Sequence, residues 1–244
     1  TATLVHDDII DNSDLRRGKT TVNVAWSNSH GVLIGDFIYS KAFMLMNEIG
    51  NFKVIDELSS ATNKIAEGEL MQLANKNNLN TSLQQLKKIS YYKTGRLFEA
   101  SAKSAAMLSG KSIPFIENIS KAAKLIGIAF QVRDDLLDYG VSKGNIGKPE
   151  MQDILEDKIT YPLYFALKYS NKKDSSKILK KLKNKDFSIE EVADFVSSSN
   201  AFNKCNSLIQ NYNNEISKCI NQISNKEIRD EMLNLSESLK NRYE

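Results

Sequence analysis

Length, composition and charge are typical of one globular domain and exclude several classes of protein. The chain has 244 residues, 41% of them hydrophobic and 26% charged, which is enough for one sizeable core. Its 33 basic and 30 acidic side chains give a formal charge of +3 and lie dispersed, so we expect no nucleic acid partner. The chain has no run of roughly 18 apolar residues and no signal-peptide pattern, so we expect a cytoplasmic protein with at most peripheral membrane contact.

The apolar pattern predicts an all-α fold. Only 3 prolines and 11 glycines occur, and apolar residues recur at spacings of three and four, so no β-hairpin is predicted. The expected helices cover residues 1–12, 29–48, 51–75, 82–109, 114–139, 151–170, 172–184, 189–198 and 200–241. The expected breaks lie at 17–21, 75–80, 109–111 and 140–149, where residues that stop helices or favour turns gather.

Two further features have ordinary interpretations. The lysines of segment 171–187 could face an acidic membrane, but a solvated helix face is favoured. Cys205 and Cys219 lie outside any CxxC or histidine cluster, so buried or incidental thiols are favoured over a disulfide or a zinc site.

Two acidic clusters share one spacing, DDIID at residues 7–11 and DDLLD at 134–138. On a helix, positions i and i+4 differ by only about 40° of rotation, so the outer aspartates of each cluster share a face. Two carboxylates four residues apart repel each other and destabilise a helix, and the apolar neighbours of both clusters indicate that the carboxylates are partly buried. A bound cation would relieve both the repulsion and the cost of burying charge. A set of ligands made only of oxygen atoms favours a hard cation such as Mg²⁺. A solvated acidic face is the alternative for a single cluster, but two clusters in apolar helices favour a metal site.

Basic residues flank both clusters. Arg16 and Arg17 follow the first, where guanidinium groups could bind phosphate oxygens in a bidentate manner. Lys93 lies within a predicted helix, and Lys148 and Lys158 follow the second cluster. Each alone is typical of a surface cation, but together with the carboxylates they predict a pocket for a metal-bound polyphosphate.

At these residues the sequence resembles the trans-isoprenyl (polyprenyl) diphosphate synthases, most of all the long-chain octaprenyl type. Residues 4–11 with 16–18 are similar to the first aspartate-rich motif of that family, and 130–138 to the second. Four shorter segments also stand in family order, at 69–73, 93–95, 147–149 and 158–162. The resemblance implies a bundle of long, mostly antiparallel helices around a deep apolar cavity, in a homodimer. Residues 1–244 would form a single helical domain that lacks the N-terminal helices of its relatives.

The resemblance also implies roles for individual residues. About three Mg²⁺ ions would bind the allylic diphosphate. Their ligands would be Asp7, Asp11 and Asp134, with Asp8, Asp135 and Asp138 as further or water-mediated ligands. The diphosphate groups would be bound by Arg16, Lys93, Lys148 and Lys158, and isopentenyl diphosphate by Arg17. Thr94 and Gln131 would turn oxygen atoms toward the allylic cation that forms.

The implied reaction joins isopentenyl diphosphate to an allylic diphosphate such as farnesyl diphosphate, head to tail and in the trans configuration. The allylic diphosphate ionises, the isopentenyl double bond attacks the cation, and a proton is lost, so no nucleophilic side chain is needed. In relatives with short products a bulky residue near the first motif limits the chain. The small Ala2 and Thr3 therefore predict a long product, of octaprenyl length for a quinone side chain.

The sequence departs from the family pattern in two places. In the pattern GKxxGxDLxEGK, Met151 and Asp157 stand at the two later glycine positions, just before Lys158. The upstream Gly-Lys-Arg segment and histidine that bind isopentenyl diphosphate in relatives are not in this sequence.

Other functions remain open at this point. A class I terpene cyclase also ionises a diphosphate, but the second DDxxD cluster with Lys158 and the Arg16-Arg17 pair favours elongation. A short-chain geranylgeranyl or farnesyl diphosphate synthase, and a non-catalytic regulatory subunit of a heteromeric synthase, are the further alternatives.

Overall fold

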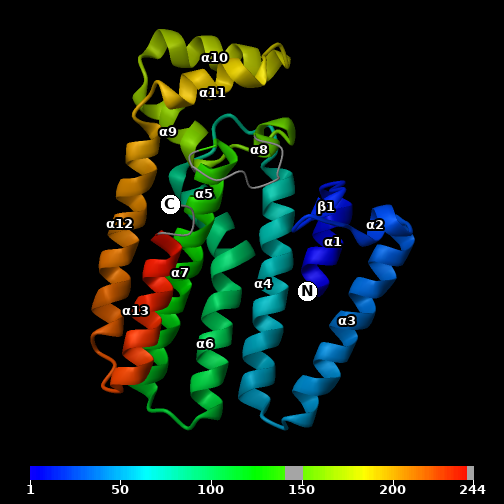
Figure 1. The fold of residues 1–244 in the computed structure, drawn as a ribbon, viewed down its shortest axis with the longest axis vertical. Coiled ribbons are helices and arrows are strands. Elements are labelled where there is room, and N and C mark those ends of the chain that lie inside the picture. The colour runs from blue at the N-terminus through cyan, green and yellow to red at the C-terminus, as the bar shows by residue number, and fades with distance from the viewer. Residues whose placement is uncertain (141–150, 241–244) are drawn as a thin grey trace. The chain divides into compact units, whose positions relative to one another are not determined.

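The computed structural model describes residues 1–140 and 151–240, which form two compact units, Thr1–Asp56 and Glu57–Glu244 (Figure 1). Apart from one short hairpin, the regular elements among the described residues of both units are helices, so the predicted all-α class is confirmed. The interpretation of the chain as one domain stays a prediction. None of the described helices is both long and apolar enough to span a bilayer.

The first unit is built on the packing of helix α1 (Ala2–Ile10) against helix α3 (Asn28–Glu48). Two glycines of α3 permit this approach, because a Cβ at Gly31 would overlap Ile9 and a Cβ at Gly35 would overlap the ring of His6. His6 Nε2 lies 3.2 Å from the carbonyl oxygen of Val32, so this histidine is hydrogen-bonded within the unit. The short helix α2 (Val22–Ala25) precedes α3, and the first residues of α4 (Phe52–Ala74) follow it.

A two-stranded hairpin joins α1 to α2, and the expectation of no hairpin is wrong. Strand β1 (Leu15–Arg16) pairs antiparallel with β2 (Lys19–Thr20). The connecting residues Arg17 and Gly18 have φ angles of 53° and 73°, and two successive positive φ values match the twist of the strands they join. Strands of two residues are too short to show alternation in the sequence, so the arginine-glycine pair was the only signal.

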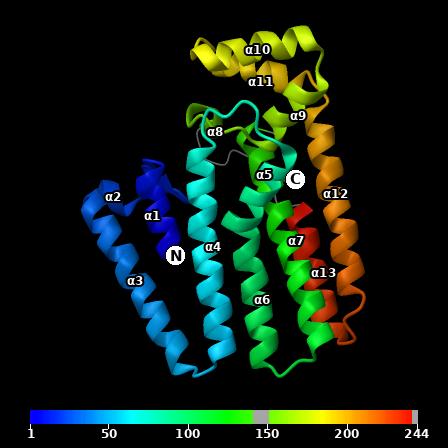
Figure 2. The same ribbon diagram turned by 180° about the vertical axis from the view of Figure 1, so that it is seen from behind.

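The second unit is a bundle with α7 (Ile113–Asp138) inside it, between α6 (Arg96–Leu108) and α12 (Ala201–Ile220) (Figures 1 and 2). The other elements are the greater part of α4, from Glu57 on, and α5 (Leu83–Ser90), the π-helix η1 (Tyr91–Gly95), α8 (Gln152–Leu155), α9 (Tyr161–Tyr169), α10 (Lys172–Asn184), α11 (Ile189–Ser197) and α13 (Lys226–Lys240). Helices α10 and α11 lie across the end of the bundle where α9 and α12 meet (Figure 1).

The core of this unit follows α7 along its length. Val132 and Leu136 are fully buried and pack with Tyr161 and Leu163 of α9. Ile126, nearer the N-terminal end of α7, packs with buried residues of α12. Both cysteines are buried, as expected, and both thiols are free. The lysines of α10 lie mainly on its exposed face.

Two of the predicted helices are wrong in extent. Segment 151–170 forms two helices, because Asp157 adopts a left-handed conformation with φ 60° and Pro162 lies in the first turn of a new helix, α9. Segment 200–241 is divided between Ile220 and Lys226. There Ile223, which is 1% exposed, packs with the α6–α7 end of the bundle, and Asn225 Oδ1 caps α13 by accepting the N–H of Ile228 at 3.0 Å. Neither proline nor glycine marks that break.

Candidate active site

The first aspartate cluster lies at the C-terminal end of α1. Asp8 is buried, and its Oδ1 accepts hydrogen bonds from the Arg16 guanidinium, with Nε at 2.7 Å and Nη2 at 2.6 Å. Asp7 and Asp11 are partly exposed, and Asp11 is the capping residue that follows the last residue of α1. Arg16, expected to bind substrate, therefore also fixes Asp8, while Arg17 is exposed at the hairpin turn.

The second cluster forms the last turn of α7 and is held by protein donors in a similar way. Asp135 is buried and accepts hydrogen bonds from Gln131 Nε2 at 2.9 Å and from the Tyr161 backbone N–H at 3.1 Å. Burial raises the pKa of Asp135 well above its usual value, and repulsion from Asp153 adds to the rise, which these two hydrogen bonds oppose. Asp134 is exposed.

Asp138 closes the second cluster by capping the next helix. Its two carboxylate oxygens accept the backbone N–H groups of Gln152 and Asp153 at 3.0 and 3.1 Å. The N-terminus of a helix favours a negative charge, so the position of Asp138 and the start of α8 depend on each other. In both clusters the second aspartate is thus turned into the protein, and the outer two lie four residues apart on another face.

Lys93 and Thr94 are presented by the π-helical turn η1. Lys93 Nζ contacts Glu69 Oε1 at 2.9 Å and Gln72 Oε1 at 2.7 Å, both on α4. Thr94 Oγ1 donates to Gln131 Oε1 at 2.8 Å, so these two residues, expected to act together, are in direct contact. Single π turns inside longer helices are frequent at functional sites.

Glycines bring this turn close to its neighbours. A Cβ on Gly68 of α4 would lie 2.6 Å from the Lys93 backbone nitrogen, and a Cβ on Gly127 of α7 would lie 2.7 Å from Gly95 Cα. Backbone atoms cannot move aside as a flexible side chain can. The turn that presents Lys93 is therefore fixed between α4 and α7 by contacts that only glycine allows.

We predict that Gly68→Ala destabilises the protein by about 2 kcal/mol, because overpacking against backbone forces the turn to shift. An exposed mid-helix glycine would behave in the opposite way, since alanine there stabilises by about 0.5–1 kcal/mol. Urea unfolding measures the change, and Asn63→Ala, at an exposed position of the same helix, is the control. A Gly68→Ala protein as stable as this control would contradict the prediction.

A chain of hydrogen bonds joins these residues across four elements. It runs from Thr94 through Gln131 to Asp135, and from Asp135 to the Tyr161 backbone. Tyr161 in turn shares a hydrogen bond of 3.0 Å with Ser90 at the end of α5. Tyr161 is the member that sequence reasoning missed as a functional residue, since its contribution is a backbone N–H.

Lys158 lies in the segment between α8 and α9, and its side chain is 10% exposed. Its Nζ is 2.5 Å from Glu156 Oε2 and 3.9 Å from Asp153 Oδ1. Asp153 was not singled out, although it is the aspartate of the GKxxGxDLxEGK pattern. Burial and then the Asp138 charge raise the pKa of Asp153 to about 7, against the opposing effect of Lys158. Lys148 lies outside the described residues.

The donor set of the second cluster fits Mg²⁺. Asp134, Asp138 and Asp153 offer only oxygen atoms. Burial and then repulsion from Asp138 raise the pKa of Asp153, so a divalent cation would relieve the cost of keeping these carboxylates charged. Among the described residues, no three or more carboxylate, histidine or cysteine side chains form a complete metal site. Mg²⁺ commonly retains waters and takes substrate phosphates as ligands, so an incomplete protein set suits it.

Comparison with known proteins identifies a class and a family. A structure of a polyprenyl synthase from Caulobacter crescentus, complexed with calcium and isoprenyl diphosphate, matches with a TM-score of 0.92 and 30% identity, over 100% of this chain and 75% of that chain. The fold is therefore that of the helical isoprenoid synthases. The family model described as polyprenyl synthetase matches residues 1–199, and the chain belongs to the polyprenyl synthetase family.

Two curated relatives place the chain more closely. It is 42% identical over 178 residues to octaprenyl diphosphate synthase of Escherichia coli (strain K12), covering 73% of this chain and 55% of that protein. It is 37% identical over 206 residues to the geranyl-diphosphate-specific all-trans-nonaprenyl-diphosphate synthase of Rhodobacter capsulatus, covering 84% and 63%. The chain thus spans little more than half the length of the octaprenyl relative.

Proposed function

We propose that this protein is a Mg²⁺-dependent long-chain trans-polyprenyl diphosphate synthase, which condenses isopentenyl diphosphate with an allylic diphosphate. The observation that carries the proposal is the shared arrangement of the two DDxxD clusters. In each, the second aspartate is buried and fixed by donors of the protein. The outer two, Asp7 with Asp11 and Asp134 with Asp138, stand four residues apart and would bind metal, Asp138 while it also caps α8. Membership of the family supports the same conclusion.

The proposed roles of the residues follow from what they contact. Asp8 and Asp135 would orient their clusters and would not bind metal directly. The proposed metal ligands are therefore fewer than the six aspartates expected from the sequence. Lys93 and Lys158 each lie beside carboxylates that keep the ammonium group in place, and each would contribute a fixed positive charge to a diphosphate. Thr94 retains oxygen lone pairs beyond its bond to Gln131 and would face the positive charge of the substrate.

In the proposed reaction the C–O bond of the allylic diphosphate breaks and pyrophosphate carries away the electron pair. The double bond of isopentenyl diphosphate then attacks the allylic cation, and the departing pyrophosphate takes the proton that is lost. Mg²⁺ would neutralise charge on the leaving group. The protein contributes fixed charges and dipoles, which stabilise the developing pyrophosphate without reorganising.

The test is incubation of the full-length protein with Mg²⁺, farnesyl diphosphate and labelled isopentenyl diphosphate, followed by chromatography of the dephosphorylated products. A ladder ending at a long polyprenol is the expected result. Cyclic or short products would instead identify a cyclase or a short-chain synthase. No incorporation by folded protein would favour the regulatory-subunit function. Light scattering of the same sample tests the homodimer that the family resemblance implies.

Product length is the finer part of the proposal, and we propose about eight isoprene units. The support is the small size of Ala2 and Thr3 in the first turn of α1, together with the octaprenyl and nonaprenyl relatives. Ala2 is buried and Thr3 is partly exposed, so the two positions will not tolerate a large side chain equally.

We predict that Ala2→Phe shortens the product by several isoprene units, because a phenyl ring would block the growing chain. Thr3→Phe, at the more exposed position, provides a second variant in case the buried one unfolds. Chromatography of the polyprenols measures the length, and thermal unfolding verifies the fold. If both variants fold and both yield the wild-type ladder, these positions do not set chain length.

A further inference from the structure

Three of the residues with unusual backbone conformations meet at one place. Asn77, Asp157 and Lys185 have φ angles of 60°, 60° and 55°, in the left-handed region that residues other than glycine rarely adopt. They come from the loop between α4 and α5, the segment between α8 and α9, and the C-terminal end of α10. These residues are called the Asp157 cluster below.

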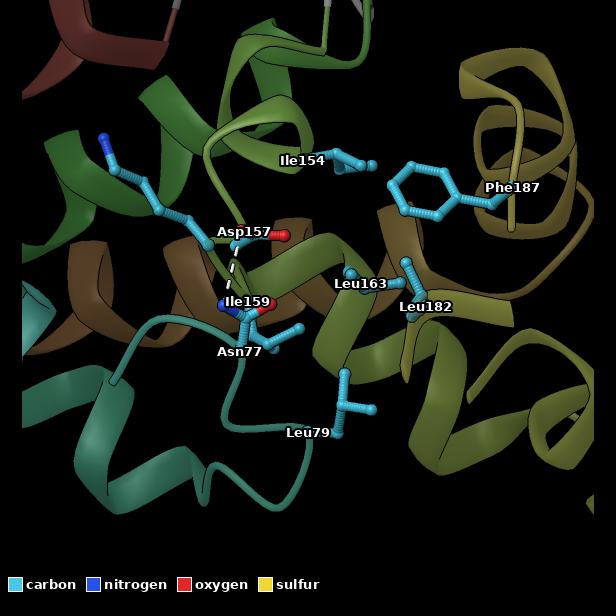
Figure 3. A pocket seen from close by; sticks show the side chains of 9 residues that line it. Asn77, Leu79, Ile154, Asp157, Ile159, Leu163, Leu182 and Phe187 are labelled. Atoms are coloured by element: carbon cyan, nitrogen blue, oxygen red, sulfur yellow. Dashed lines mark hydrogen bonds between the residues drawn. The ribbon is translucent and has the colours of Figure 1, made fainter. Parts of the chain in front are cut away.

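Asp157 is the centre of this cluster. Its carbonyl oxygen accepts the backbone N–H of Asn77 at 2.9 Å, and its Oδ2 accepts the Asn77 side-chain amide at 3.3 Å (Figure 3). The same Oδ2 accepts a charge-assisted hydrogen bond from Lys185 Nζ at 2.6 Å. One carboxylate therefore links three segments that are far apart in the sequence.

The loop that carries Asn77 is itself firmly held. The side-chain oxygen of Asn75 accepts hydrogen bonds from Asn78 Nδ2 at 2.8 Å, Thr81 Oγ1 at 3.1 Å and Gln85 Nε2 at 2.8 Å. A buried amide with three donors fixes the loop against the start of α5. The loop thus provides a rigid support to which Asp157 is tied.

The left-handed conformation explains why Asp157 is unusual. It stands at a position where the family pattern has glycine, and so does Met151, which has a φ of 64°. Glycine adopts this region at no cost, whereas other residues lose about 1–2 kcal/mol, less for Asp and Asn. The chain keeps the backbone shape that glycine would permit and gains a carboxylate that glycine lacks.

The backbone conformation at Asp157 determines the position of the Lys158 backbone, from which the Lys158 side chain extends. The N–H of Asp157 bonds to Ile154 O at 3.0 Å, and the N–H of Lys158 bonds to Asp153 O at 2.8 Å, which closes the end of α8. Beside this segment lies a small cavity of about 20 Å³, lined by Leu79, Leu163, Leu182 and Phe187 among others (Figure 3).

We propose that Asp157 is a positioning residue that holds Lys158 in place by tying its segment to Asn77 and Lys185. This proposal rests on the proposed role of Lys158 in binding a diphosphate. Asp157 acts through Lys158 and does not itself touch substrate. Glycine at this position could adopt the same backbone turn but would lack the carboxylate that contacts Lys185.

The first test measures how strongly the hydrogen bonds of Asp157 hold its segment to the Asn77 loop and to Lys185. Asp157→Gly removes the carboxylate and also relieves the backbone cost, so the variant should fold, while Asp157→Asn keeps an acceptor and a residue that tolerates positive φ. We expect backbone amides of 75–81 and 152–160 to exchange several-fold faster in Asp157→Gly and in Lys185→Ala. Asp157→Asn should restore most of the protection. Lys183→Ala, an exposed lysine of the same helix, is the control. Unchanged exchange in Asp157→Gly overturns the proposal.

The second test asks whether the effect passes through Lys158. Affinity for inorganic pyrophosphate in Mg²⁺, measured by calorimetry, should fall about tenfold in Asp157→Gly, less than the ~100-fold that a 1 Å displacement of a catalytic group can cost. The same substitution should have no effect in a Lys158→Ala background, since residues that act through one another are not additive. Equal losses in both backgrounds, or none in either, overturn the proposal.

The two proposals can fail separately. Wild-type protein that binds pyrophosphate but does not elongate would refute the synthase function, while the cycle with Lys158→Ala still decides the role of Asp157. Wild-type protein that elongates but shows no coupling between Asp157 and Lys158 would refute the positioning role alone. Wild-type protein that does not bind pyrophosphate refutes the role of Lys158 and the positioning proposal with it.

Discussion

Asp134→Ala is expected to lower kcat for elongation by about 10³-fold, the size of effect found when a group that stabilises charge in a transition state is removed. Asp134 is exposed at the end of α7, so the substitution should leave the free energy of unfolding unchanged within about 0.5 kcal/mol. Steady-state kinetics with varied Mg²⁺ measures the effect. Glu117→Ala, at an exposed carboxylate on the same helix, should retain wild-type activity.

Asp135→Asn provides the contrast within the same cluster. Asp135 accepts two hydrogen bonds, from Gln131 and from the Tyr161 backbone, and an amide can accept only one of them while its NH₂ group faces the other donor. We expect a loss of about 1–3 kcal/mol of stability, which Asp134→Ala should not show. Activity of Asp134→Ala within tenfold of wild type would refute its assignment as a metal ligand.

Glu57→Ala is expected to cost about 3 kcal/mol of stability, because it leaves a buried arginine without its main partner. Glu57 on α4 is 8% exposed in its side chain, with Oε1 2.6 Å from Arg96 Nη1 and Oε2 2.6 Å from Lys103 Nζ. Arg96 would keep the weaker ion pair with Glu99, at 3.3 Å. This ion network joins α4 to the start of α6, directly after the π turn that carries Lys93. Urea unfolding measures the loss.

The control for Glu57 lies on the same helix. Glu67 pairs with Lys64 at 2.5 Å, but both side chains are more than a third exposed, so Glu67→Ala should change stability by about 0.5 kcal/mol or less. Burial would raise the pKa of Glu57, but hydrogen bonds and charges of Lys103 and Arg96 outweigh it and lower the pKa below 4.5. The stabilisation is therefore present above pH 4.5 and is lost as the pH falls through the lowered pKa. The difference between wild type and Glu57→Ala should shrink below pH 4.5, and a constant difference would contradict the assignment.

Expectations based on local pattern were mostly accurate. The long helices from 29 to 48, 51 to 75 and 114 to 139 agree with α3, α4 and α7 to within a residue or two, because their apolar spacing is sustained over many turns. The hairpin at Arg17 and the break near Asn225 were missed. Both are short, and both depend on a few backbone conformations or caps that leave almost no trace in a periodic pattern.

The sequence by itself determined the helical class and the family, and it predicted which aspartates and basic residues would carry the chemistry, because DDxxD on a helix aligns carboxylates whatever surrounds it. Only the tertiary structure decided that Asp8 and Asp135 are turned inward, since their partners lie on the hairpin and on α7 and α9. The tertiary structure also decided that Asp157 and Met151 keep the backbone shape of glycine. Spacing along the chain reports which residues share a helix face, but hydrogen bonds between distant segments determine what each of them is able to bind.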